Sequence, residues 1–259
     1  NEAVLQFGTA VKTAGGRAHL MGLVSDGGVH GHIQHIKAAI KALVDQGLEV
    51  VFHAITDGRD VAPNSADKFI ADLVSDLPAQ AVIGSVTGRY YALDRDNRWE
   101  RVETAYNAMI LGQGETAPSA GAAISQNYTK DITDEFMPAT VIDGYEGVEA
   151  GDGFFCLNFR SDRAREILAA IGAPDFDGFA RSQVEFSALL GMVKYSDAHD
   201  AYMTTVFPKR QIDNTLGHWV ALQGKTQFRL AETEKYPHVT FFLNGGVEVP
   251  EPHEDRFMP

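Results

Sequence analysis

Apolar residues recur along this chain in two alternating patterns, short continuous runs and longer stretches with helical spacing. Residues 19–24 form such a run and predict a buried strand, whereas residues 33–44 carry apolar side chains on one helical face, with Gly47 placed to end the helix. Residues 50–55 predict the next strand. Because two strands joined through a helix are expected to be parallel, with a right-handed crossover, this stretch predicts a βαβ unit.

The same unit repeats through most of the chain, and Asn64 or Ser65 is expected to cap the helix after the second strand. Further strands are predicted over 81–86, 154–159, within 184–193, over 226–230 and over 239–243, and further helices over 4–12, 65–77, 99–110, 161–171 and 213–222. Residues 112–153 are rich in Gly, Pro, Ser and Thr, and we interpret them as an elaborated connection with a short strand near 139–142. The repeat predicts an α/β fold, with a mostly parallel sheet and helices on both faces.

Composition narrows the class of protein. An apolar share of 44% with 22% charged residues is ordinary for a soluble globular protein. The apolar runs are far shorter than the roughly 20 residues of a membrane helix, and the start of the chain lacks the pattern of a signal peptide. Cys156 is the single cysteine and lies in a predicted apolar strand, so we expect an inert buried thiol and a cytoplasmic location.

The net charge of the chain limits the kinds of partner that it can bind. The formal net charge of −13 argues against nucleic acid and anionic membrane surfaces. The arginines nevertheless gather in short groups, which are Arg59, then Arg89, Arg95, Arg98 and Arg101, then Arg160, Arg163 and Arg165. A local basic pocket in an acidic protein points to a small anionic ligand.

The candidate site residues all follow predicted strands. They are His30 after the first strand, Asp57, Arg59 and Asp60 after the second, Arg89 and Arg95 after the third, and Arg160 and Arg163 after the fourth. Ligands of open parallel sheets bind beyond the carboxyl ends of the strands, so we expect one pocket that holds two anionic groups and has a carboxylate left to act as acid or base. After the fourth strand, Ser161 or Asp162 is expected to cap a helix whose first N–H groups would add to the anion site.

Each of these residues also has a structural interpretation. His30 and His32 could form half of a metal site, although contact with a substrate is favoured because further ligands are not evident. Asp57 and Asp60 could simply cap the next turn. We expect the aromatic residues Tyr90, Tyr91 and Trp99 in the core or the pocket wall, and Arg98 and Arg101 on a solvated helix face.

Five stretches together resemble the cofactor-independent phosphoglycerate mutase family. They are SDGGVH at 25–30, DGRD at 57–60, GRYYALDRD at 88–96, NFRSDR at 158–163 and AETEKYPHVTFF at 231–242. The resemblance implies an enzyme that interconverts 3-phosphoglycerate and 2-phosphoglycerate through a phosphoserine intermediate, using two Mn²⁺ ions. It also implies two lobes, so that residues 1–207 resemble the inserted phosphotransferase lobe, and residues 208–259 resemble the start of the returning alkaline-phosphatase-like lobe.

The resemblance implies a role for each matched residue. His30, Arg59, Arg89 and Arg95 would hold the glycerate and its carboxylate. Asp60 would move the proton on and off the hydroxyl group that loses or gains phosphate. Arg160 and Arg163 would grip the phosphate, and Lys235 would reach in from the other lobe to neutralise the transferring group.

Two family features are missing from the sequence, the Asn-Ser-Glu nucleophile stretch and the Asp and His segments that bind the metals. We therefore expect a truncated mutase that presents the substrate but is inactive alone and contains none of the metal ligands. The complete enzyme is expected to be a monomer that closes its lobes, with a hinge near 206–209. Two other interpretations stay open, a non-catalytic module that senses an acidic metabolite, and a metal-dependent phosphatase or phosphopentomutase relative.

Overall fold

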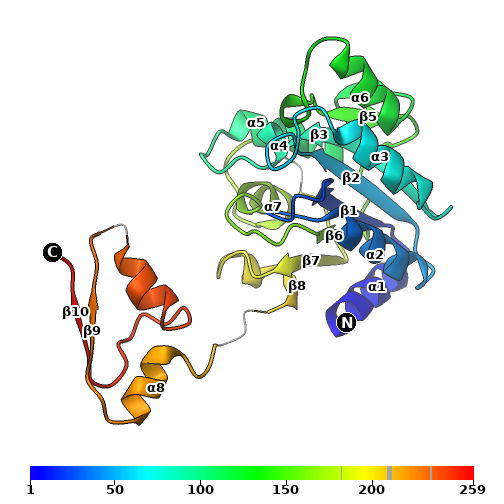
Figure 1. Ribbon diagram of the computed structural model, residues 1–259. Coiled ribbons are helices and arrows are strands. Elements are labelled where there is room, and N and C mark those ends of the chain that lie inside the picture. Colours follow the sequence, from blue (N-terminus) through cyan, green and yellow to red (C-terminus); the bar gives the residue numbers. More distant parts are fainter. Residues whose placement is uncertain (182, 209–211, 234) are drawn as a thin grey trace. The chain divides into compact units, whose positions relative to one another are not determined.

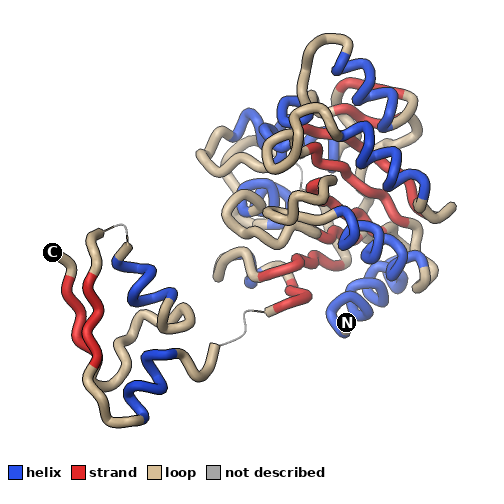
Figure 2. Tube along the Cα trace, viewed as in Figure 1, coloured by secondary structure: helices blue, strands red, loops and turns tan. Residues whose placement is uncertain are grey.

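A mostly parallel β-sheet forms the centre of the first part of the chain, with helices packed on both of its faces (Figure 1 and Figure 2). The structure is a computed structural model that describes residues 1–181, 183–208, 212–233 and 235–259. It divides into two units, Asn1–Pro208 and Lys209–Pro259, and the first unit carries this sheet. The predicted α/β class is confirmed. Lys209 of the predicted hinge lies outside the described residues.

The sheet of the first unit has the strand order β4-β5-β3-β2-β1-β6-β7-β8, and its pairs are parallel except that of β3 with β5. The strands are β1 (Ala18–Leu23), β2 (Val50–Thr56), β3 (Ala81–Gly88), β4 (Glu115–Ala117), β5 (Thr140–Ile142), β6 (Gly153–Cys156), β7 (Ala188–Val193) and β8 (Thr204–Phe207). Since β3, β2, β1 and β6 are parallel neighbours, the loops after them lie side by side at one edge.

Helices cover the two faces as separate layers. One layer contains α1 (Glu2–Ala14), α2 (Ile33–Val44), α3 (Ala66–Ser75) and α6 (Ala120–Tyr128), and the other contains α4 (Arg89–Ala92), α5 (Trp99–Ile110) and α7 (Arg165–Gly172). Strand side chains alternate between the layers, so Leu20 packs in the first core and Met21 in the second. Two 3₁₀ turns, η1 (Asp134–Phe136) and η2 (His199–Ala201), lie in the connections. Within the described ranges, no helix has the length and apolarity needed to cross a membrane.

The predicted strand over 154–159 is too long, because β6 ends at Cys156. At this point the side-chain oxygen of Asn158 accepts a hydrogen bond from the Leu23 N–H at 2.9 Å, where a longer strand would offer a backbone carbonyl. The predicted cap at Ser161 or Asp162 is also wrong. Helix α7 begins at Arg165 after Ala164, without a side-chain cap, so Arg160 and Arg163 lie in the loop between β6 and α7.

Helix α3 is capped from a distant segment instead of by its own N-cap side chain. Ser65 occupies the N-cap position, but its hydroxyl group donates to the Ala62 carbonyl at 2.7 Å. Asp134 Oδ2 accepts the Ser65 N–H at 2.8 Å and the Ala66 N–H at 2.9 Å. The connection over 112–153 thus supports the core, and it contains helix α6, which the sequence did not lead us to expect.

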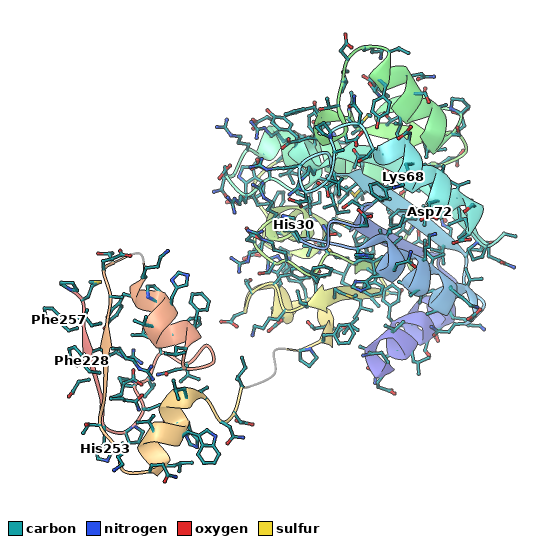
Figure 3. The ribbon with its side chains drawn as sticks, viewed as in Figure 1. His30, Lys68, Asp72, Phe228, His253 and Phe257 are labelled. Carbon is teal, nitrogen blue, oxygen red and sulfur yellow. The ribbon has the colours of Figure 1, made fainter. Side chains whose placement is uncertain are left out.

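The second unit contains α8 (Leu216–Leu222), β9 (Gln227–Leu230), the π-helix η3 (His238–Phe242) and β10 (Glu254–Phe257), with β9 and β10 parallel. The strand predicted over 239–243 is wrong, because this stretch is helical and the Thr240 hydroxyl group donates to the Tyr236 carbonyl one turn earlier at 2.7 Å. Phe228 and Phe257 project outward from the small sheet and are exposed (Figure 3).

Candidate active site

Arg89 joins two carboxylates at the carboxyl edge of the sheet. It is the first residue of α4, directly after β3, and its side chain is 3% exposed. Its Nη1 lies 2.6 Å from Asp57 Oδ1 and 2.6 Å from Asp60 Oδ2, and both aspartates come from the loop after β2. The predicted convergence of these two loops is therefore present.

Asp57 serves as an anchor for the loop after β2. Besides Arg89, its carboxylate accepts hydrogen bonds from Ser25 Oγ at 2.6 Å and from the N–H groups of Arg59 and Asp60 at 3.2 and 3.0 Å. Burial alone would raise the pKa of Asp57, but these hydrogen bonds and Arg89 outweigh it and hold the pKa below its usual range. Asp57 is thus a buried carboxylate that stays ionised and fixes the loop that presents Asp60.

His30 faces Asp60 as a neutral imidazole. Its Nε2 lies 3.9 Å from Asp60 Oδ2, and its ring is almost fully buried in the loops beyond β1 (Figure 3). Burial, followed by the nearby Arg89 charge, lowers the pKa of His30 to about 4. Among the described residues the buried Nδ1 atom has no hydrogen-bond partner, so the ring retains polar capacity for a ligand.

A second group of charges lies at the rim, in the loops after β3 and β6. Asp162 Oδ2 lies 2.7 Å from Arg95 Nη1, and Asp162 Oδ1 lies 2.8 Å from Arg160 Nε. These three side chains are between 32% and 46% exposed, in contrast to the buried group around Arg89. The predicted capping residue Asp162 thus acts as the counterion of two predicted ligand-binding arginines.

Arg163 lies near both groups of charges. Its Nη1 donates to the Leu93 carbonyl at 3.1 Å. Burial, followed by the charges of Arg95, Arg89 and Arg59, lowers the pKa of Arg163, as expected where several cations share one small region. A pocket of about 310 Å³ lies here, lined by Arg59, Arg89, Tyr90, Asp94, Asp96, Arg101, Glu135, Phe136 and Arg163.

Several residues of this pocket were not expected there, among them Arg101, Glu135 and Phe136. Arg101 was assigned to a solvated helix face, but its guanidinium group lies 3.9 Å from the centre of the Tyr90 ring and donates to Asp94 Oδ1 at 3.2 Å. Glu135 and Phe136 come from η1, and Glu135 pairs with Arg59 at 3.3 Å. The local sequence carries no motif that marks these two residues, because their place depends on the fold of the long connection.

Lys235 and His32 belong to other segments of the chain than the pocket residues. Lys235 belongs to the second unit and is exposed, so its approach to the substrate stays a prediction, and Glu234 of the same motif lies outside the described residues. His32 caps α2, since its Nδ1 accepts the Gln34 N–H at 3.1 Å. In the described part of the chain, no three His, Cys, Asp or Glu side chains converge as a metal site, so these residues do not fit a bound metal ion.

Comparison with known proteins places this geometry in context. Residues 1–197 match the family model described as the BPG-independent PGAM N-terminus. The whole chain is 69% identical to a 2,3-bisphosphoglycerate-independent phosphoglycerate mutase of Agrobacterium fabrum and 62% identical to one of Paracoccus denitrificans, and it covers 51% of each. It also matches a solved structure of Leishmania mexicana phosphoglycerate mutase at low cobalt concentration, with a TM-score of 0.78 and 29% identity, over all of this chain and 50% of that one. The chain therefore spans about half the length of the curated relatives it matches.

Proposed function

Because this chain belongs to the family of 2,3-bisphosphoglycerate-independent phosphoglycerate mutases, we propose that it forms the substrate-binding half of an enzyme that interconverts 3-phosphoglycerate and 2-phosphoglycerate. The observation that carries this proposal is the convergence of His30, Asp60 and Arg89 beside Arg59 and Arg163. The ligand has a carboxylate, a phosphate and a hydroxyl group. Several cations and one partly free carboxylate match these three groups.

Each residue has a task in phosphoryl transfer. Asp60 accepts the proton of the attacking substrate hydroxyl group and later returns one, and the neutral His30 ring orients that hydroxyl group. The guanidinium groups hold the carboxylate and the phosphate, so that the transferring group stays in position and its charge is balanced. In this proposal Lys235 adds a further cation to the transferring phosphate from the second unit.

We assign the metal chemistry to residues outside this chain. The family resemblance implies two Mn²⁺ ions in the complete enzyme, which would supply electrostatic stabilisation of the phosphate when bound. The described residues do not fit such a site, and we route no step of this half through a metal. We also propose that the complete enzyme is cytoplasmic and works as a monomer.

The direct test of the proposed function is ³¹P NMR of 3-phosphoglycerate with the complete enzyme that contains this chain. Without added bisphosphoglycerate, we expect the 2-phosphoglycerate signal to appear with Mn²⁺ and to be absent with excess chelator. If a folded complete protein converts nothing in either condition, the mutase assignment is wrong. A protein that then still binds 3-phosphoglycerate would instead be a sensor of an acidic metabolite.

A further inference from the structure

Asp162 occupies the place between two arginines that a ligand anion would be expected to take. Its Oδ1 accepts from Arg160 Nε at 2.8 Å, and its Oδ2 accepts from Arg160 Nη2 at 3.3 Å and from Arg95 Nη1 at 2.7 Å. The contact with Arg160 is the two-pronged arrangement by which a guanidinium group binds a free carboxylate or phosphate. The protein itself therefore supplies one negative charge to Arg95 and Arg160, and this group of three side chains keeps a net charge of +1.

Asp162 directly precedes Arg163, a residue that lines the binding pocket, whereas Asp162 itself is not one of the lining residues. The negative charge of Asp162 partly offsets the lowering of the Arg163 pKa that burial and the neighbouring arginines cause. Arg163 in turn lines the pocket with Arg59 and Arg89. Asp162 thus lies near the group of arginines that, in the proposed function, bind the substrate.

Asp162 is held by fewer and more exposed contacts than Asp57, the buried carboxylate bound to Arg89. Asp57 is buried and accepts two backbone N–H groups besides Arg89, so it cannot leave without exposing unpaired donors. Asp162 has a side chain that is 32% exposed, and within the described part of the chain its carboxylate is held by the two arginine side chains. Water can take over its hydrogen bonds when it turns outward.

We propose that Asp162 is a built-in counterion, which occupies the Arg95 and Arg160 guanidinium groups in the ligand-free protein and is displaced by an anionic group of the substrate. This inference rests on the proposed function, because it assigns Arg95 and Arg160 to the binding of phosphoglycerate. It makes Asp162 a residue that sets affinity. The protein binds its ligand less tightly than the bare arginine pair would, and small single anions compete poorly for the occupied pair.

The test compares Asp162→Asn with the unchanged 259-residue chain by isothermal titration at low salt. The matched control is Asp197→Asn, which removes the same charge from an exposed carboxylate paired with Lys194 at 2.6 Å. The probes are 3-phosphoglycerate and inorganic phosphate, and circular dichroism confirms that each variant is folded. We expect Asp162→Asn to bind both probes about 3- to 10-fold more tightly, the range expected for one partly exposed ion pair, and Asp197→Asn to match the unchanged chain.

The outcomes separate this inference from the proposed function. If Asp162→Asn binds 3-phosphoglycerate with unchanged or weaker affinity, the counterion role is wrong and Asp162 instead positions the arginines for the ligand. If no variant binds 3-phosphoglycerate but Asp162→Asn binds inorganic phosphate more tightly, the counterion stands and the assigned substrate is wrong. If neither the unchanged chain nor Asp162→Asn binds either probe, both are overturned.

Discussion

Asp57 and Asp60 share one arginine but differ in what else they bind. The Asp57 carboxylate is fully engaged by Ser25, two backbone N–H groups and Arg89. Asp60 is held through Oδ2 by Arg89, and its side chain is 16% exposed compared with 1% for Asp57. A proton can therefore reach Asp60 without disturbing the loop, which supports the proposed role of Asp60 as the acid or base.

Asp60→Asn should separate chemistry from binding. In the complete enzyme we expect turnover to fall by about 10²-fold or more, because the amide cannot accept the hydroxyl proton. The affinity of this chain for 3-phosphoglycerate should change little, since the amide oxygen can still accept from Arg89. Steady-state kinetics and titration measure the two effects, with Asp45→Asn, an exposed carboxylate on the α2 C-cap, as the control. Full activity in Asp60→Asn would remove Asp60 from the mechanism.

Because Arg89 is buried and Arg95 is exposed, replacing these two arginines should have different effects on the free energy of unfolding. Arg89→Gln leaves Asp57 and Asp60 without their shared cation, and we expect it to lower the free energy of unfolding by about 3–5 kcal/mol. Arg95→Gln breaks an ion pair whose arginine is 45% exposed, so the expected loss is at most about 1 kcal/mol. Urea titration of both variants checks this order, and equal losses would contradict the assigned burial.

At the scale of elements, the short turn η1 links the core to the site. Its first residue, Asp134, binds the start of α3 and accepts the Tyr128 hydroxyl group at 2.5 Å. Its next residues, Glu135 and Phe136, line the pocket beside Arg59. A change in η1 is thus expected to affect both the stability of the fold and the position of the loop after β2.

Sequence rules expect the N-cap residue Ser65 to stabilise α3, but the structure predicts a larger effect for Asp134. Asp134→Ala should destabilise the protein by about 2–3 kcal/mol, because the Ser65 N–H and the partly buried Tyr128 hydroxyl group lose their acceptor and the Ala66 N–H keeps only Tyr128 Oη. Ser65→Ala should cost less than about 0.5 kcal/mol, below the usual loss for an N-cap, because the Ser65 side chain makes no capping bond. Thermal unfolding of the two variants decides between them, and a larger loss for Ser65→Ala would contradict this assignment.

The elements that the sequence predicts well are those whose signal is local. Residues 33–44 form α2 because their apolar spacing matches the buried Ile33, Ile36, Ile40 and Leu43. The stretch 239–243 has the composition of a strand, yet most of it lies in η3, and the Thr240 hydroxyl group bonds to the Tyr236 carbonyl of the preceding turn. The cap of α3 depends on Asp134, a contact between residues far apart in sequence, and local patterns carry no information about it.

At the scale of the molecule, a buried polar chain crosses the sheet of the first unit. Asp152 Oδ2 lies 2.9 Å from His19 Nε2, His19 Nδ1 lies 3.1 Å from His53 Nε2, and His53 Nδ1 lies 2.9 Å from Ser85 Oγ. All three hydrogen bonds form with neutral imidazoles when Ser85 Oγ–H donates to His53 Nδ1, His53 Nε2–H donates to His19 Nδ1 and His19 Nε2–H donates to Asp152. Burial lowers the pKa of His19 and holds the pKa of His53 well below its ordinary value.

This polar chain predicts a loss of stability in mild acid. Because the folded-state pKa values of His19, His53 and His30 lie below the unfolded value of about 6.5, the unfolded state binds more protons as pH falls. Stability is highest above about pH 7 and declines as the pH falls through about 6.5, and His30, with a pKa of about 4, contributes about 1 kcal/mol of this loss between pH 7 and 5.5. Urea midpoints across this range should show the decline, and His53→Gln should reduce its slope. An equal reduction in His35→Gln, whose residue is exposed, would contradict the assignment.

The place of the site could be predicted from topology, but its internal pairing could not. Parallel neighbouring strands are expected to bring the loops of His30, Asp60, Arg89 and Arg160 to one edge of the sheet. The observed neighbours β3, β2, β1 and β6 place these loops there. Which carboxylate faces which guanidinium depends on side-chain packing, so Asp162 was expected at a helix cap and is found between Arg95 and Arg160. The resemblance to known mutases supplied roles that the arginine spacing alone left open.

The most direct test of the central claim uses the 259-residue chain alone, with 3-phosphoglycerate and Mn²⁺. Isothermal titration measures binding, and ³¹P NMR of the same sample measures conversion. We predict saturable binding without any 2-phosphoglycerate signal, because we propose that the chain presents the substrate and that the rest of the enzyme supplies the nucleophile and the metal ligands. Metal-dependent conversion by this chain, or no binding by a folded sample, would contradict the claim that it is the substrate-binding half of a mutase.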